Sequence, residues 1–240
     1  MSGLHQLYQR LQFGANPLGL LVDPYYIARR GLYLGIRRCA HAIGGVVLDV
    51  GCGRKPYENL FAADYYLGLE IAQDVQSRDQ PDCYYNGSQF PFARDSIDSI
   101  VCNQVLEHVF NPGTFLSETT RVLKPGGRLL LTVPFVWEEH EQPFDYARYS
   151  SFGLKHLLAE HGYTVVDEYQ SNRGLSVIFQ LFTAYVYGLA GGRNRWLNSL
   201  LILLLAPINL LGMLLGSLTP GGKSLYLDNV ILAEKRTGQS

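Results

Sequence analysis

The chain has 240 residues and a formal net charge of −1, and 47% of its residues are hydrophobic against 17% charged. This length is sufficient for one domain with a full core, and the near-zero charge gives no indication of a nucleic acid partner. The four cysteines are scattered without a Cys-x-x-Cys pair, which argues against structural zinc and is typical of a reducing compartment.

Residues 1–44 are predicted to form an N-terminal helical extension. Residues 1–16 lack the continuous apolar core of a signal peptide. Residues 25–43 have a helical pattern that mixes aromatic side chains with four arginines: Arg29, Arg30, Arg37 and Arg38. Two interpretations stay open here, a helix that packs beside the domain with its arginines in water, or a basic amphipathic helix at an anionic membrane surface.

A glycine turn after an apolar run is the central motif. Residues 46–50 predict a strand buried on both faces, and the run ends at Gly51 and Gly53. Glycines permit a tight turn and the close approach of a ligand. The third glycine of the dinucleotide fingerprint is replaced by Pro56, so that fingerprint fails. Asp49 at the ligand edge would repel a pyrophosphate and favour a positively charged ligand.

The sequence of residues 48–53, Leu-Asp-Val-Gly-Cys-Gly, resembles the first motif of class I S-adenosylmethionine-dependent methyltransferases, in particular bacterial type 11-like members. S-adenosylmethionine carries a sulfonium and an ammonium group, which suit the charge of Asp49. The resemblance implies an α/β, Rossmann-like sheet of seven strands with helices on both faces. It also implies S-adenosylmethionine as the cofactor, bound at Asp49, Gly51, Cys52 and Gly53.

The next segments extend the predicted cofactor site. Residues 57–63 are expected to form the first crossover helix and residues 65–70 the second strand. Glu70 ends this strand about twenty residues after the glycines, where an acidic side chain can accept both ribose hydroxyls; the alternative is a surface glutamate. A short strand at 83–85 leads to Asn86 and Gly87. The family usually has an acidic residue at position 86, near the adenine amino group, and an asparagine carbonyl can still accept that proton.

Residues 95–102 resemble the family's fourth strand. Asn103 and Gln104 follow it, where the resemblance implies contact with the methionine part of the cofactor. Glu107 and His108 match the family's Glu-His pair, which is either catalytic or a hydrogen-bonded pair at a helix end. After a helix ending near 123, the Lys-Pro-Gly-Gly turn at 124–127 precedes the fifth strand, residues 128–133.

The loop at 134–149 is the predicted substrate site, because it leaves the ligand-binding edge of the sheet. It resembles, more weakly, His-x-x-Pro-x-Asp-Tyr-x-Arg-Tyr loops of a bacterial subset linked with cell-surface polysaccharide or lipid-linked sugar pathways. His140 is the predicted base, since histidine exchanges protons near neutral pH. Asp145 either orients His140 or acts in its place, and Arg148 binds an anionic substrate group or pairs with Asp145. The remaining predicted site residues are Tyr146 and Tyr149 for the substrate, with His108 as a further catalytic candidate.

No metal site is predicted. Glu138, Glu139, His140 and Glu141 offer ligand atoms, but adjacent acidic residues in a loop are usually solvated.

A long apolar insertion follows a helix at 151–161 and a sixth strand at 163–169. It contains apolar runs at 175–190 and 196–218, and the second run has no charge and is long enough to span a bilayer. Pro207 and Asn209 favour a break within it. Because the seventh strand, 224–234, must return to the same sheet, a single crossing is excluded. We expect an interfacial or re-entrant helical hairpin with cytoplasmic ends flanked by basic residues; the alternative is a buried dimer or cap surface.

These expectations combine into one hypothesis. The predicted domains are the extension 1–44, the methyltransferase domain 45–174 with 222–236, and the insertion 175–221. The expected function is S-adenosylmethionine-dependent O-methylation of a lipid-linked or cell-surface glycan acceptor, at the cytoplasmic face of the membrane. The expected partners are the cofactor, an unknown acceptor, and a membrane surface or a homodimer, without nucleic acid. Two alternatives stay open: a membrane-associated cofactor-binding scaffold without catalysis, and a methyltransferase of a small soluble metabolite.

Overall fold

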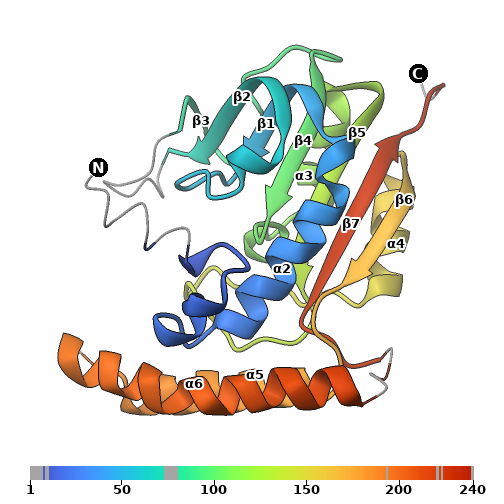
Figure 1. Cartoon of the computed structure of the whole chain (residues 1–240). Coiled ribbons are helices and arrows are strands. Elements are labelled where there is room, and N and C mark those ends of the chain that lie inside the picture. The colour runs from blue at the N-terminus through green and yellow to red at the C-terminus, as the bar shows by residue number, and fades with distance from the viewer. Residues whose placement is uncertain are drawn as a thin grey trace. The chain divides into compact units, whose positions relative to one another are not determined.

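The computed structural model describes Tyr8 and residues 11–72, 81–192, 194–219, 222 and 224–238. Seven strands form one sheet in the order β3-β2-β1-β4-β5-β7-β6 (Figure 1). The strands are β1 (Gly44–Val50), β2 (Ala62–Ile71), β3 (Cys83–Tyr85), β4 (Ile97–Asn103), β5 (Leu123–Pro134), β6 (Tyr163–Gln170) and β7 (Asp228–Lys235).

The chain divides into two compact units, which are described separately below. The first comprises Met1–Gly35 with Gln170–Asp228, and the second comprises Ile36–Tyr169 with Asn229–Ser240. The second unit therefore contains nearly all of the sheet. The domain boundaries predicted from the sequence stay a prediction.

The parallel centre of the sheet positions the candidate site. β1 pairs in parallel with both β2 and β4, and β4 pairs in parallel with β5, so the carboxyl ends of these strands share one edge. β7 runs in the opposite direction to β4 (Figure 1). The predicted burial of β1 on both faces is confirmed at Val47 and Leu48, which lie on opposite faces of the strand and are both fully buried.

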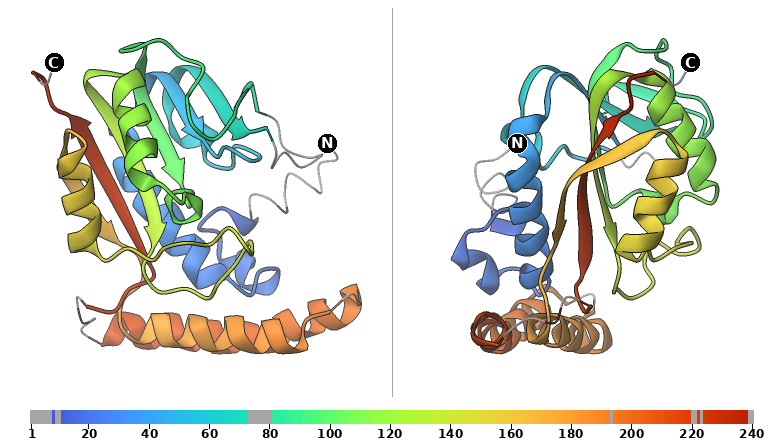
Figure 2. Two further views of the ribbon diagram at one scale, coloured as in Figure 1. Left: turned by 180° about the vertical axis from the view of Figure 1, so that it is seen from behind. Right: turned by 90° about the vertical axis from the view of Figure 1, so that its right-hand side faces the viewer.

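Two helices cover one face of the sheet in the second unit, α3 (Pro112–Val122) and α4 (Ser151–Glu160) (Figure 2). Ser150 caps α4, because its hydroxyl accepts a hydrogen bond from the Gly153 amide at 3.2 Å. The helix predicted at 25–43 is α2 (Tyr26–Cys39), followed by a 3₁₀ turn, Ala40–Ala42. Its last turn is held to the sheet by the guanidinium of Arg38, which donates to both carboxylate oxygens of Asp167 at 2.8 and 2.9 Å.

The crossover helix predicted at 57–63 is wrong. Only a 3₁₀ turn forms there, Glu58–Leu60, and β2 already begins at Ala62. The aromatic side chains explain this difference, since Tyr57 is buried and the ring of Phe61 stacks on that of Tyr66 at 6.0 Å. These contacts favour a short connection into an aromatic-rich strand over a separate helix.

The apolar insertion forms two helices of the first unit, α5 (Leu175–Ala190) and α6 (Arg195–Leu218), which lie side by side (Figure 2). The predicted break at Pro207 is wrong, because α6 continues through this residue. An interior proline costs a helix about 3 kcal/mol. Packing of α6 along α5, and the buried hydrogen bonds of Asn209, offset this cost.

Candidate functional site

The glycine turn after β1 has the backbone geometry that its residues predict. Gly51 and Gly53 have φ values of 69° and 48°, in the left-handed region that favours glycine. A Cβ added at Gly51 would lie 2.3 Å from a methyl group of Val105, whereas one at Gly53 would meet no described atom within 4 Å. Gly51 thus serves close packing, whereas the Cβ position of Gly53 has free space beside it. Cys52 between them is buried, and burial raises the pKa of its thiol to about 12.

Asp49 is a buried acid at the end of β1. Its side chain accepts a hydrogen bond from the hydroxyl of Tyr66 at 2.7 Å. Burial is the main cause that raises the pKa of this carboxyl to about 7; the hydrogen bond from Tyr66 opposes the rise and the nearby charge of Glu70 contributes to it. A cation bound next to Asp49 would favour its ionised form. Asp49 therefore has the charge response expected for a cationic ligand.

Glu70 links the second strand to the glycine turn. Its Oε1 accepts a hydrogen bond from the backbone amide of Gly53 at 2.6 Å. Next to it, the carboxylate of Asp82 accepts from the Gly68 amide at 2.7 Å and pairs with Lys55. Glu70 thus lies at the glycine turn, and its predicted contact with the ribose stays a prediction. Sequence reasoning missed Asp82, Lys55 and Tyr66. Tyr66 lies in β2 opposite Val47 of β1, a register that motif spacing does not give.

Asn86 and Gly87 form a polar turn after β3. The carbonyl oxygen of the Asn86 side chain lies within 3.3 Å of three donors, the amides of Ser88 and Gln89 and the hydroxyl of Ser88. Gly87 is exposed with a φ of 84°. The adenine contact predicted for Asn86 stays a prediction, and it would require this carbonyl to exchange a local partner for the ligand.

Asn103 and Gln104 lie at the end of β4, on the same edge as Asp49. Gln104 has a φ of 55°, an uncommon conformation for a non-glycine residue, and its backbone amide donates to the Thr132 carbonyl at 3.0 Å. The Thr132 hydroxyl accepts from Gln104 Nε2 at 3.3 Å and donates to Asn103 Oδ1 at 3.4 Å. Thr132 of β5, which sequence reasoning missed, therefore orients both side chains.

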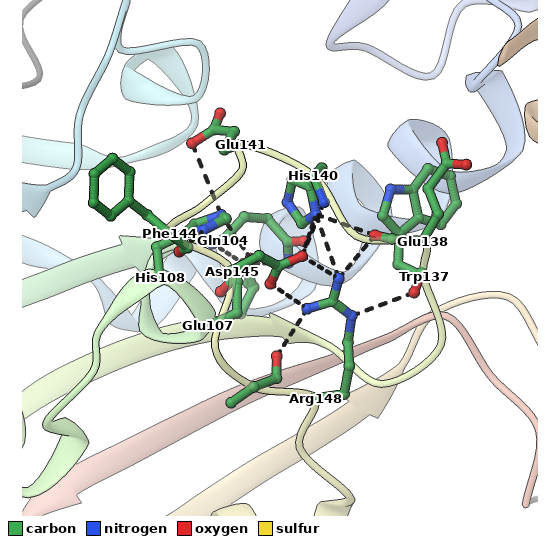
Figure 3. Close-up of polar contacts among 12 residues, drawn as sticks. Gln104, Glu107, His108, Trp137, Glu138, His140, Glu141, Phe144, Asp145 and Arg148 are labelled. Atoms are coloured by element: carbon green, nitrogen blue, oxygen red, sulfur yellow. Dashed lines mark hydrogen bonds and ion pairs between the residues drawn. The ribbon is translucent and has the colours of Figure 1, made fainter.

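Arg148 organises the loop that follows β5 (Figure 3). Its guanidinium donates to both carboxylate oxygens of Asp145 at 2.6 Å, a bidentate pair. It also donates to the carbonyls of Glu138 and Ala147 at 2.8 and 2.9 Å. Arg148 holds the pKa of Asp145 well below its usual range. Of the two roles considered for Arg148, the structure shows the pairing with Asp145.

His140 lies against the Asp145 carboxylate. Its backbone amide donates to Asp145 Oδ2 at 2.9 Å, and its Nδ1 lies 3.2 Å from the same oxygen and 3.3 Å from the Glu138 carbonyl. Arg148 Nη2 is 3.4 Å from Nδ1. Because two acceptors face Nδ1, we assign the proton to this nitrogen, which leaves Nε2 as a proton acceptor.

His108 and Glu107 pack against His140. The two imidazole rings meet edge to face with centroids 4.8 Å apart, and His108 Nδ1 lies 2.9 Å from the Phe144 carbonyl. The Glu107 side chain is fully buried, and its Oε1 lies 3.9 Å from His108 Nε2. The predicted catalytic residues His140, Asp145 and His108 therefore come together in one cluster, and Glu107 joins them.

The same cluster offers ligand atoms to a metal ion. One atom each of Glu107, His108 and His140 lie within 4.8 Å of one another. Two ligands of one zinc ion, each about 2.0–2.2 Å from it, are at most about 4.4 Å apart. The cluster would have to contract to bind an ion, so we assign no metal here.

The predicted substrate residues differ in exposure. Tyr146 is 45% exposed, and its ring meets that of Phe110 edge to face at 5.2 Å. Tyr149 is partly buried, and burial raises the pKa of its hydroxyl. Its backbone carbonyl accepts a hydrogen bond at 2.8 Å from the side chain of Asn229, a buried β7 residue that the sequence did not indicate.

The sequence of this chain is similar to those of known methyltransferases. Residues 48–131 match the family described as "Methyltransferase domain". A probable S-adenosylmethionine-dependent methyltransferase of Mycolicibacterium smegmatis is 33% identical over 125 residues, which are 48% of each chain. An uncharacterized methyltransferase of Mycobacterium tuberculosis is 28% identical over 144 residues, 54% of this chain and 56% of that protein. The chain spans about half the length of the curated relatives that it matches.

Solved structures share the fold at low identity. The S-adenosylmethionine-dependent methyltransferase of Mesorhizobium loti aligns with a TM-score of 0.55 and 13% identity, over 87% of this chain and 100% of that one. Phosphoethanolamine N-methyltransferase 2 of Haemonchus contortus, solved with S-adenosylmethionine, aligns with a TM-score of 0.52 and 14% identity, over 99% of this chain and 61% of that one.

The fold is therefore that of the class I, Rossmann-like methyltransferases, as predicted. Within it, residues 48–131 match the family model of the methyltransferase domain, and the relatives that the chain resembles include a probable S-adenosylmethionine-dependent methyltransferase. The predicted resemblance and the cofactor that it implies are confirmed at this level. The roles of the single site residues stay predictions.

Proposed function

We propose that this protein transfers the methyl group of S-adenosylmethionine to an acceptor hydroxyl. The observation that carries the proposal is that two acidic side chains lie at the glycine turn after β1. Asp49 is buried at the end of the strand, and Glu70 accepts a hydrogen bond from the Gly53 amide. These residues fit the cofactor, because Asp49 would face its positive charge and Glu70 its ribose. Asn103 and Gln104 would contact its methionine part.

S-adenosylmethionine, when bound, supplies both the methyl group and the leaving group, so the protein mainly positions the acceptor. His140 is the proposed base. Its Nε2 would accept the proton of the acceptor hydroxyl, while Nδ1–H donates to Asp145. Asp145 stays ionised because Arg148 pairs with it, and this negative charge stabilises the protonated imidazole.

We further propose a lipid-linked or cell-surface glycan acceptor at the cytoplasmic face of the membrane. Support comes from the resemblance of the loop at 134–149 and from exposed aromatic rings beside the His140 cluster. Phe110, Phe144 and Tyr146 are 74%, 54% and 45% exposed. Aromatic faces of this kind can stack on the apolar side of a sugar ring. A small soluble metabolite as acceptor, or cofactor binding without catalysis, would leave these rings without a role.

Labelled S-adenosylmethionine tests the proposal directly. The purified full chain is incubated with labelled cofactor and with separate membrane and soluble extracts from cells that lack the protein. We expect label in a lipid-extractable product of the membrane fraction, and none with Glu70→Ala as the control. Label only in small soluble molecules would support the metabolite alternative. Cofactor binding by calorimetry without any labelled product would support the scaffold.

A further inference from the structure

The α5 helix has an apolar exposed side. Ile178, Phe182, Tyr185 and Leu189 are each more than half exposed and recur every three or four residues, which aligns them on one face. The opposite face contains buried polar residues, among them Gln180 and Thr183. This distribution is the reverse of a helix that packs on a water-soluble protein.

The α6 helix repeats this arrangement over its whole length. Its exposed apolar residues form a stripe along all 24 residues of the helix, about 36 Å at 1.5 Å per residue. The stripe consists of Trp196, Leu197, Leu200, Leu203, Leu204, Pro207, Leu210, Leu211, Leu214 and Leu218. Among the described residues, α6 is the one helix long and apolar enough to cross a membrane, and only 22% of its most apolar window is buried.

We call α5 and α6 together the hairpin, and the side opposite to its exposed apolar residues its inner face. Buried hydrogen bonds fix this inner face to the N-terminal segment. The side-chain amides of Gln180 and Asn209 donate to the Pro24 carbonyl at 3.1 and 3.2 Å. The Gln180 carbonyl accepts from the Ala28 amide at 3.0 Å, and the Thr183 hydroxyl donates to Asn209 at 2.9 Å. The hairpin therefore presents a fixed face to the N-terminal segment of its own unit and its apolar stripe outward.

We propose that this stripe of α5 and α6 lies in one leaflet of a phospholipid bilayer, with both helix axes along the membrane plane. Lipid is the occupant because the stripe has no charged side chain, whereas the rim of a protein interface is polar. The exposed cations Arg173 and Arg195 stand at the starts of the two helices, and neither helix has an acidic residue. A tryptophan beside an arginine at one end is the usual anchor at an anionic membrane surface.

The contacts of the inner face argue against a hairpin that spans the bilayer. The segment that it packs against includes the buried acid Asp23, which pairs with Arg29 at 3.0 Å. Ionic groups are costly in the hydrocarbon core, so this face stays with protein. In the sequence, both helices follow β6 and precede β7, and these two strands are neighbours in one sheet. A single crossing of the membrane by the helices is therefore excluded. The inference is independent of the methyl transfer proposed above.

Vesicle flotation tests the attachment with the purified full chain. We expect the protein to float with vesicles of phosphatidylcholine and phosphatidylglycerol. The double variant Leu203→Glu, Leu210→Glu should lower the partition coefficient by about a hundred-fold or more, since each leucine loses its burial in lipid. Arg195→Ala should lower it by about five-fold, and only when phosphatidylglycerol is present.

The matched control adds the same two charges elsewhere. Phe152→Glu with Val166→Glu alters exposed residues of α4 and β6, which are 81% and 52% exposed, and should leave flotation unchanged. Circular dichroism and cofactor binding verify that all variants fold. Absence of flotation, together with a detergent-free dimer that Leu203→Glu, Leu210→Glu converts to a monomer, would overturn the proposal in favour of a second copy.

Tryptophan fluorescence distinguishes a helix in the membrane plane from one that spans. The chain has two tryptophans, so Trp137→Phe leaves Trp196 as a single reporter. Leu203→Trp with both native tryptophans changed to phenylalanine moves the reporter towards the middle of α6. With lipids brominated at known depths, we expect shallow quenching at both positions. Deep quenching at position 203 with shallow quenching at 196 would show a spanning helix and contradict the planar arrangement.

Discussion

At the residue scale, Asp49 combines a binding role with a cost in stability. An unfolded aspartate titrates near 3.9, but burial raises the pKa of Asp49 to about 7 in the folded protein. The folded state then binds a proton more tightly than the unfolded state does. Its contribution to stability is therefore present at low pH and is lost as pH rises from about 4 to about 7. An acid kept at such a cost is expected to serve a ligand.

Asp49→Asn separates these two effects. The amide oxygen can still accept the Tyr66 hydroxyl, so we expect the free protein to gain about 1–4 kcal/mol of unfolding free energy at about pH 8 and little at about pH 4. Affinity for S-adenosylmethionine should fall about ten-fold or more. Between about pH 5.5 and about pH 7.5, the wild-type affinity should rise as Asp49 ionises and that of the variant should not. Denaturant titration measures the free energy of unfolding, and calorimetry measures the affinity for S-adenosylmethionine. Equal cofactor affinity in the two proteins would contradict the assignment of Asp49 to the cofactor site.

His140 is tested by separating turnover from binding. His140→Ala should lower kcat by about a hundred-fold or more while cofactor affinity stays near normal. His108→Ala, which removes the neighbouring ring, serves as the comparison. A variant that loses cofactor affinity and kcat together would indicate a structural role, and full activity would move the base to Asp145 or His108 or show that none is needed.

At the scale of elements, the hairpin has a polar inner face that the apolar sequence of its two helices does not reveal. Gln180 is fully buried in a helix without a charged residue, and it contacts the backbone of Pro24 and Ala28. Such buried polar contacts fix one orientation of the helices, because any rotation would leave their donors and acceptors without partners.

Gln180→Leu should therefore destabilise the protein by about 2–3 kcal/mol, since the Ala28 amide and Pro24 carbonyl lose a buried partner. Ile178→Gln, which changes an exposed residue two positions away, is the matched control and should cost less than about 0.5 kcal/mol. Thermal unfolding in mild detergent measures both. Similar losses in the two variants would show that the buried amide does not fix the hairpin.

The sequence predicted the elements and residues that short-range patterns determine. The run from Leu48 to Gly53 and the distance to Glu70 are local spacings, so the turn and its acid were found. Tyr66, Thr132 and Asn229 contact the site through strand register and tertiary packing, which spacing does not reveal. The break predicted at Pro207 was wrong for the same reason. The sequence shows the cost of a proline inside a helix, but Asn209 offsets it through contacts with Thr183 and Pro24, which are 26 and 185 residues away.

At the scale of the whole molecule, the proposed cofactor site and the proposed membrane-binding stripe belong to different units. Asp49, Gly53, Glu70 and His140 all belong to the unit formed by Ile36–Tyr169 and Asn229–Ser240, whereas the apolar stripe belongs to the other. Cofactor binding and membrane attachment are then separable properties. The chain links them only through α2 and through the connections of the hairpin to β6 and β7.

Replacing residues 175–218 with a short Gly-Ser turn tests this separation. The variant should bind S-adenosylmethionine with near-normal affinity, because none of the proposed cofactor residues is removed. It should no longer float with vesicles, and turnover of a lipid-linked acceptor should fall while the affinity for cofactor does not. In this variant, Pro24 and Ala28 lose the hydrogen bonds with Gln180 and Asn209, so residues 11–35 should become sensitive to protease. The double variant Leu203→Glu, Leu210→Glu keeps these bonds and should not become sensitive. Loss of cofactor binding in a variant that stays folded by circular dichroism would show that the hairpin supports the cofactor site and that the two properties are not separable.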